Sequence, residues 1–175
     1  MDELKGDLKM KVEFNHLGVS VGDIDKAVEF YTTVLGGRKL MGPFPIKNDG
    51  GTTGITNTLY GGHGQTWTSF KLCQVVLANG VGLELMEFEG GYDANPITEF
   101  EFKKHGIFHF AITVDDTKAF VEEIQKWGGE LYSDWAPRPW KGEDTLTVYV
   151  KDPFGLVYEV HDHSYEFLNT MPARA

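Results

Sequence analysis

His16-Leu-Gly-Val-Ser-Val-Gly-Asp23 and His109-Phe-Ala-Ile-Thr-Val-Asp-Asp116 are two copies of one pattern in this chain of 175 residues. Each copy continues into a stretch with apolar residues at helical spacing and ends at a glycine pair, Gly36-Gly37 or Gly128-Gly129. Glycine readily adopts the left-handed geometry that ends a helix. The sequence therefore predicts a duplicated strand–helix unit with a histidine at the equivalent point of each copy.

The two strands have the same alternation of side chains, which is the period of a half-buried strand. His16 and His109 lie on the face that carries small residues, such as Gly18 and Ala111. The opposite, apolar face carries Leu17, Val19 and Val21 in the first copy and Phe110, Ile112 and Val114 in the second. Both histidines are therefore predicted to lie on the face away from the helix.

The remainder of each copy is predicted to form further strands, which gives a βαβββ unit twice and an α+β fold. The strands are expected at Thr66–Leu77, Val81–Phe88, Thr145–Val150 and Gly155–His161. The predicted organisation is an N-terminal extension (1–11), a first module (12–90) with an inserted loop at about 42–65, a linker (91–104), a second module (105–161) and a C-terminal tail (162–175).

Charge and composition limit the partners. The formal net charge of −10 argues against nucleic acid or an anionic membrane, since phosphates are bound by lysine and arginine. No apolar run approaches the length of about 20 residues that a membrane span needs. A single cysteine, Cys73, excludes an intrachain disulfide, and the charged start has no secretory signal. A cytoplasmic protein with a small-molecule substrate is expected.

One carboxylate stands in the last strand of each module, Glu84 and Glu159, between apolar neighbours. Strand parity separates Glu84 from Glu87, which shares the face of Leu83 and Leu85. A buried carboxylate needs a compensating partner. A lone histidine at a strand start is usually structural, and an acid in an edge strand is usually solvated. The joint recurrence of both residues favours a site with two imidazoles and two carboxylates for a divalent ion.

The chain resembles the vicinal oxygen chelate superfamily, which includes glyoxalase I, bleomycin and fosfomycin resistance proteins and extradiol dioxygenases. The resemblance is carried by Asn15-His-Leu-Gly-Val-Ser-Val21, Ala27–Gly37, Gly82–Phe88, Phe108–Asp116 and Asp152–Val160. It implies two tandem modules that form a cupped, barrel-like mixed sheet with the helices outside, around one divalent metal ion (Ni, Zn, Co, Mn or Fe). It also implies a homodimer. The ligand positions of the family correspond to His16, Glu84, His109 and Glu159.

This ligand order is similar to that of glyoxalase I. The resemblance implies a lyase or isomerase that acts on a small oxygenated substrate through an enediolate, with Glu159 as the base and Glu84 as the next candidate. His161 and Tyr158 are candidates for a supporting or substrate-contacting role. Ser20 and Phe88 stand where bacterial glyoxalase I has an arginine and an asparagine that contact glutathione, so the glutathione contacts are not evident.

Two alternatives remain open. In an Fe(II)-dependent ring-cleaving dioxygenase, His16, His109 and Glu159 would bind the iron, and a fourth ligand at Glu84 would crowd the site. In a non-catalytic binding or resistance protein, aromatic residues would hold an apolar ligand, although core packing also accounts for them. These aromatic residues are Trp67, Phe70, Trp135 and Trp140.

Overall fold

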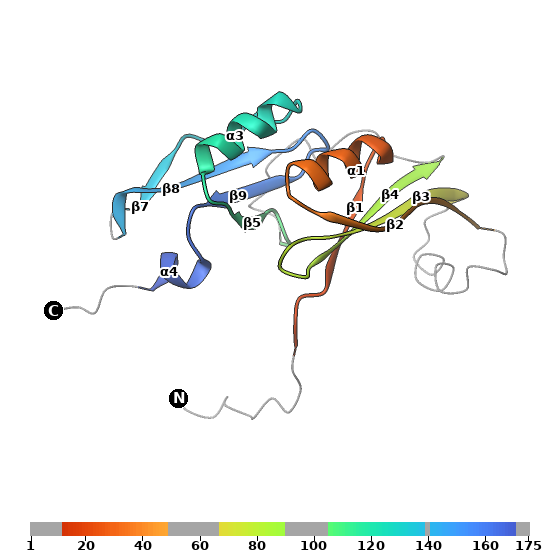
Figure 1. Ribbon diagram of the computed structural model, residues 1–175, viewed down its shortest axis with the longest axis horizontal. Coiled ribbons are helices and arrows are strands. Elements are labelled where there is room, and N and C mark those ends of the chain that lie inside the picture. The colour runs from red at the N-terminus through yellow and green to blue at the C-terminus, as the bar shows by residue number, and fades with distance from the viewer. Residues whose placement is uncertain (1–11, 49–66, 90–104, 139–140, 171–175) are drawn as a thin grey trace. The chain divides into compact units, whose positions relative to one another are not determined.

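The computed structural model describes residues 12–48, 67–89, 105–138 and 141–170 (Figure 1). The chain divides into two compact units, Met1–Gly90 and Gly91–Ala175. The N-terminal extension (1–11), most of the expected inserted loop (42–65) and the whole of the expected linker (91–104) lie outside the described residues.

The first unit is a four-stranded mixed sheet with one helix over it (Figure 1). Its strands lie in the order β1-β4-β3-β2, with β1 parallel to β4 and the other pairs antiparallel. The first and last strands of the unit are therefore neighbours. The elements are β1 (His16–Ser20), α1 (Ile24–Thr33), β2 (Arg38–Lys47), β3 (Ser69–Val76) and β4 (Gly82–Glu89).

The second unit repeats this plan in the order β5-β9-β8-β6, with β7 also paired to β8 and with β5 parallel to β9. The predicted α+β class and the repeated unit are confirmed. The elements are β5 (Phe110–Thr113), α3 (Thr117–Lys126), β6 (Glu130–Leu131), β7 (Ala136–Arg138), β8 (Gly142–Lys151), β9 (Val157–His161) and α4 (Tyr165–Asn169).

An aspartate directly before the first residue caps each of the two long helices. The Asp23 carboxylate accepts a hydrogen bond from the Lys26 amide, and the Asp116 carboxylate accepts from the amides of Lys118 and Ala119. Such caps satisfy amides that have no partner within the helix. The inner face of α1 is fully buried and supplies the core of the first unit with Ile24, Ala27, Phe30 and Tyr31.

The two glycines after each helix have different roles. The first has a positive φ, 63° at Gly36 and 90° at Gly128, which favours glycine. The second allows a close approach, because a Cβ added at Gly37 would lie 2.6 Å from Val75 Cγ1. The pair therefore ends the helix and turns the chain tightly against the sheet.

The predicted loop at about 42–65 is wrong over its first residues, since β2 continues to Lys47. Pro43 and Pro45 argued for a loop, but proline is tolerated at a sheet edge, where its missing N–H removes no essential hydrogen bond. β2 is such an edge, and its pairing with β3 shifts register twice before Phe44. In the expected C-terminal tail, α4 packs through Leu168, which is 1% exposed. Within the described residues, no helix has the length and apolar character to cross a membrane.

Candidate functional site

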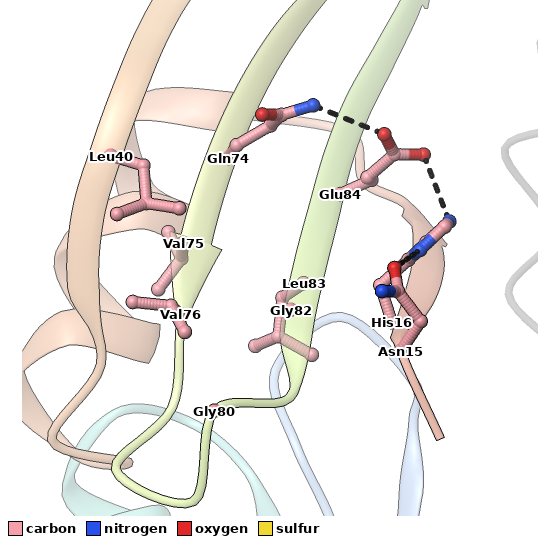
Figure 2. A pocket seen from close by; sticks show the side chains of 10 residues that line it. All are labelled: Asn15, His16, Leu40, Gln74, Val75, Val76, Gly80, Gly82, Leu83 and Glu84. Atoms are coloured by element: carbon pink, nitrogen blue, oxygen red, sulfur yellow. Dashed lines mark hydrogen bonds and ion pairs between the residues drawn. The ribbon is translucent and has the colours of Figure 1, made fainter. Parts of the chain in front are cut away.

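In the first unit, strand pairing brings His16 and Glu84 together. The parallel register places Gly18 beside Glu84 and His16 beside Gly82, so the two functional side chains are diagonal neighbours on one face. His16 Nε2 lies 3.5 Å from Glu84 Oε2 (Figure 2). Gly18 has no side chain to stand between them. The small residue at position 18 therefore allows the side chains of His16 and Glu84 to approach each other.

Two amide side chains contact this pair. Asn15 Oδ1 lies 2.6 Å from His16 Nδ1, and Gln74 Nε2 donates to Glu84 Oε1 at 3.1 Å (Figure 2). Gln74 comes from β3, where it is the direct cross-strand partner of Glu84. Sequence reasoning gave neither amide a role. The available signal for Asn15 was its place immediately before His16, whereas the role of Gln74 depends on the cross-strand register of β3 and β4.

The second unit repeats the arrangement with a further histidine. Ala111 pairs with Glu159 as Gly18 pairs with Glu84, and His109 Nε2 lies 3.3 Å from Glu159 Oε2. His161 Nε2 lies 3.5 Å from the same oxygen. His161 is 6% exposed, and its Nδ1 is 3.1 Å from Thr147 Oγ1. Each unit therefore brings one candidate histidine beside one candidate glutamate of the same unit.

The donor atoms of each pair fit a divalent ion. Two ligand atoms at about 2.1 Å from one ion, with an octahedral or tetrahedral angle, are about 3.0–3.4 Å apart. The separation of 3.3 Å in the second unit falls in this range, and that of 3.5 Å in the first lies just above it. Imidazole nitrogen with carboxylate oxygen also suits first-row metals. Among the described residues, no cluster of three or more histidine, cysteine, aspartate or glutamate side chains is arranged to hold an ion.

Side chains on the opposite face of β4 and β9 make contacts that stabilise the fold. Glu87 Oε2 accepts a hydrogen bond from the Ile24 amide at the start of α1, and Glu87 also pairs with Lys71 at 3.0 Å. The hydrogen bond that the Lys71 side chain donates to Glu87 is the largest cause that raises the pKa of Lys71. The predicted distinction between Glu84 and Glu87 is confirmed. Tyr158 is fully buried on this face of β9, where its hydroxyl donates to Asp152, so it does not lie beside Glu159.

A cavity of about 320 Å³ adjoins His16 and Glu84 within the first unit (Figure 2). The two amides, Asn15 and Gln74, also line it, and its remaining wall is mostly aliphatic, with Leu40, Val76 and Leu83 among its residues. Of the aromatic residues considered as ligand contacts, Trp67 and Phe70 are buried together with Met86 in a hydrophobic cluster, Trp135 is half-buried, and Trp140 lies outside the described residues.

Comparison with known proteins identifies the family. The sequence model of the Glyoxalase/Bleomycin resistance protein/Dioxygenase superfamily matches residues 13–160, which is most of the chain. The chain belongs to this superfamily. The resemblance inferred from the motifs around His16, Glu84, His109 and Glu159 is thereby confirmed at the level of the family.

Relatives within the superfamily include lactoylglutathione lyases. One from Arabidopsis thaliana is 28% identical over 159 residues, which are 91% of this chain and 47% of that protein. A probable lactoylglutathione lyase from Vibrio cholerae is 30% identical over 145 residues, covering 83% of this chain and 86% of the relative. The chain thus spans about half the length of the Arabidopsis relative and most of the bacterial one.

Solved structures share the fold at lower identity. A glyoxalase family protein from Bacillus cereus has a TM-score of 0.67 at 17% identity and covers 88% of this chain and 96% of its own. A mutant fosfomycin resistance protein from Listeria monocytogenes, complexed with Mn(II) and a dihydroxypropylphosphonic acid, has a TM-score of 0.55 at 16% identity, with coverages of 91% and 96%. At these identities the likeness concerns the fold alone.

Proposed function

We propose that this protein is a divalent-metal-dependent lyase or isomerase of the glyoxalase I type, and that His16, Glu84, His109 and Glu159 are the ligands of one ion. The observation that carries the proposal is the recurrence, in both units, of a histidine Nε2 facing a glutamate Oε2 at 3.5 and 3.3 Å. A structural histidine has no reason to recur with the same carboxylate partner at the same register. The similarity to lactoylglutathione lyases adds support.

The two carboxylates have different surroundings, which suggests different roles. Gln74 donates to Oε1 of Glu84, which holds this carboxylate in one orientation and suits the proposed role of a ligand. Glu159 Oε2 has an imidazole on either side, from His109 and His161. An imidazole N–H of His161 can donate to this oxygen, so His161 can hold the Glu159 carboxylate in place. Glu159 is therefore the proposed base and Glu84 the second candidate.

The reaction proposed is removal of a proton from a carbon beside a carbonyl, with return of the proton at another position. A bound divalent ion would supply Lewis-acid stabilisation of the negative charge that develops on the substrate oxygens. Glu159 would accept the proton, and a positioned base of this kind contributes about 10²–10⁴-fold in rate. His161 would orient the Glu159 carboxylate from its buried side. The substrate is expected to be a small molecule with two neighbouring oxygens.

The test begins with elemental analysis of protein purified without chelators, for which we expect one divalent ion per chain. The metal-loaded protein would then be screened with hemithioacetals, acyl-CoA thioesters and catechols. Glu159→Gln should retain the ion and lose turnover by at least about 100-fold. A Glu159→Gln variant with full turnover would remove the role as base. A protein without an ion whose ligand binding survives EDTA would support a binding function instead.

The screen also separates the remaining alternative. Oxygen-dependent cleavage of a catechol by the Fe(II)-loaded protein would favour the dioxygenase and overturn the lyase or isomerase. The homodimer and the cytoplasmic location stay predictions, to be tested by molecular mass in solution and by cell fractionation.

A further inference from the structure

We propose that Asn15 and Gln74 are positioning residues that hold His16 and Glu84 in their metal-binding state before the ion arrives. This inference rests on the proposed function, since it concerns two of the four proposed ligands. It assigns a task to two side chains that are not themselves ligands. Asn15 and Gln74 would set which nitrogen of His16 carries the lone pair that faces the site and which oxygen of Glu84 points towards it.

Asn15 determines the tautomer of His16. An amide oxygen can only accept a hydrogen bond, so the contact of 2.6 Å between Asn15 Oδ1 and His16 Nδ1 requires a proton on Nδ1. In the neutral ring, the lone pair is then on Nε2, the atom that faces Glu84 Oε2 at 3.5 Å. Neutral imidazole with a free Nε2 lone pair is the form that binds a metal. Asn15 therefore removes the non-binding tautomer.

Gln74 orients the carboxylate of Glu84 in the same way. Its amide N–H donates to Oε1 at 3.1 Å, which directs Oε2 towards His16 (Figure 2). Glu84 is 29% exposed, so without this bond its carboxylate could rotate into solvent. The backbone of Asn15 is also held, because its carbonyl accepts from the Gly82 amide at 2.9 Å. The side chains of His16 and Glu84 are thus each held by a neighbouring amide side chain.

The second unit has no amide side chains at the two corresponding positions, so the fold itself does not require them. Phe108 and Tyr149 occupy the positions that correspond to Asn15 and Gln74. Their rings pack edge-on against His109, with centroid distances of 4.5 and 5.3 Å. The amides of the first unit are therefore specific to the His16–Glu84 pair.

The first experiment measures the tautomer of His16 in metal-free protein by ¹⁵N nuclear magnetic resonance at about pH 8, where an ordinary imidazole is neutral. We expect a proton on Nδ1 in the wild type and in Asn15→Asp, which keeps an acceptor. Asn15→Leu should lose this preference. A wild-type ring that carries a proton on Nε2, alone or together with Nδ1, would overturn the inference, whatever the enzyme proves to catalyse.

The second experiment titrates the full chain with Zn²⁺ against a competing chromophoric chelator. Asn15→Leu and Gln74→Leu should each weaken binding by about tenfold, the lower end of what such supporting residues contribute, and Asn15→Asp should restore it. The matched control is Asn79→Leu, because Asn79 is an exposed asparagine of the same unit whose amide oxygen accepts from Val81 in a turn. Its affinity should equal that of the wild type.

Different results would overturn the positioning role of the two amides and the proposed function. Wild-type protein that binds Zn²⁺ through His16, with unchanged affinity in both leucine variants, would overturn the positioning role and leave the proposed function intact. Wild-type protein that does not bind Zn²⁺ would overturn both. Circular dichroism of each variant checks folding, and Asn15→Asp provides the rescue that a merely structural loss would not show.

Discussion

His161 and Glu159 lie two residues apart on β9 and point to the same side of the sheet, with 3.5 Å between Nε2 and Oε2. His109 approaches the same oxygen to 3.3 Å. Because the imidazole of His161 is buried and lies within hydrogen-bond distance of Thr147, the carboxylate rests against a fixed ring on its inner side. The first unit has Met86 at the matching place, two residues after Glu84.

His161→Met makes the second unit resemble the first at this position. Methionine fills the space but offers no N–H to Glu159, so we expect turnover to fall by about 10–100-fold while the ion is retained. Steady-state kinetics with the substrate found in the screen, together with metal content and melting temperature, checks this. An unchanged kcat in a folded, metal-loaded variant would show that His161 does not support Glu159.

Asp152 is a buried carboxylate that holds the turn before β9. It is 2% exposed and accepts hydrogen bonds from the amides of Phe154 and Leu156, both at 2.9 Å, and from the Tyr158 hydroxyl. Asp152→Ala leaves three donors unsatisfied, and we expect a loss of about 3 kcal/mol in unfolding free energy. Tyr158→Phe removes one donor and should cost about 1–2 kcal/mol. Urea unfolding measures both, and equal losses would contradict the ranking.

Trp67 contributes bulk to the core, and its indole N–H is a buried donor. The residue is 8% exposed, and Nε1 finds no hydrogen-bond partner among the residues that the structure describes. Trp67→Phe loses some apolar contact but also removes a buried donor that has no partner among the described residues, so its stability should stay within about 1 kcal/mol of wild type. Phe70→Ala, in the same cluster, should cost about 3–5 kcal/mol. A larger loss for Trp67→Phe than for Phe70→Ala would refute this account.

Gly129 is required by the close approach of helix and strand. A Cβ there would lie 2.6 Å from both Ile124 Cγ2 and the Lys151 carbonyl oxygen, so Gly129→Ala should cost about 1–3 kcal/mol. The matched control is Gly18→Ala, whose Cβ would meet only Met86 Cε, at 3.4 Å, and whose counterpart in the second unit is already Ala111. Its unfolding free energy should stay within about 1 kcal/mol of wild type. Thermal unfolding distinguishes the two.

We expect the stabilisation that ionised Asp23 gives to the first unit to be lost in acid. The hydrogen bond from the Lys26 amide is the first cause that lowers the pKa of Asp23. A lowered pKa in the folded state gives stability that is present above the ordinary aspartate pKa and is lost as pH falls through the folded value. Asp23→Asn keeps a cap but does not ionise. The melting-temperature advantage of wild type over Asp23→Asn should therefore shrink between about pH 5 and pH 3, and a constant difference would contradict this.

The sequence predicted the parts of the fold that repeat. Alternation along His16–Val21 and around Glu84 identified which side chains share a face, because a strand has a period of two and one face is buried. The helix starts and the glycine pairs were also recognisable, since capping and close approach restrict the residue types. Parity and the duplication identified the four candidate side chains, whereas the approach of each histidine to a glutamate of its own unit came from the strand register.

Features that depend on position in the sheet could not be predicted. β2 contains two prolines and reads as a loop, and only its place at the sheet edge makes it a strand. Gln74 acquires its role from a cross-strand register that its own neighbours in sequence do not reveal. Tyr158 adjoins Glu159 in sequence, but the pleat sends it to the opposite side. Each of these depends on which strands become neighbours.

The parallel pairing of the first and last strands in each unit has a consequence for folding. His16 on β1 meets Glu84 only when β4 lies beside β1, and the helix and two strands lie between these strands in the sequence. Such a contact has a large sequence separation and carries the loop-closure entropy of the whole unit. This pair exists only where β1 lies beside β4, so an ion that it binds stabilises the chains in which the first and last strands of the unit are paired.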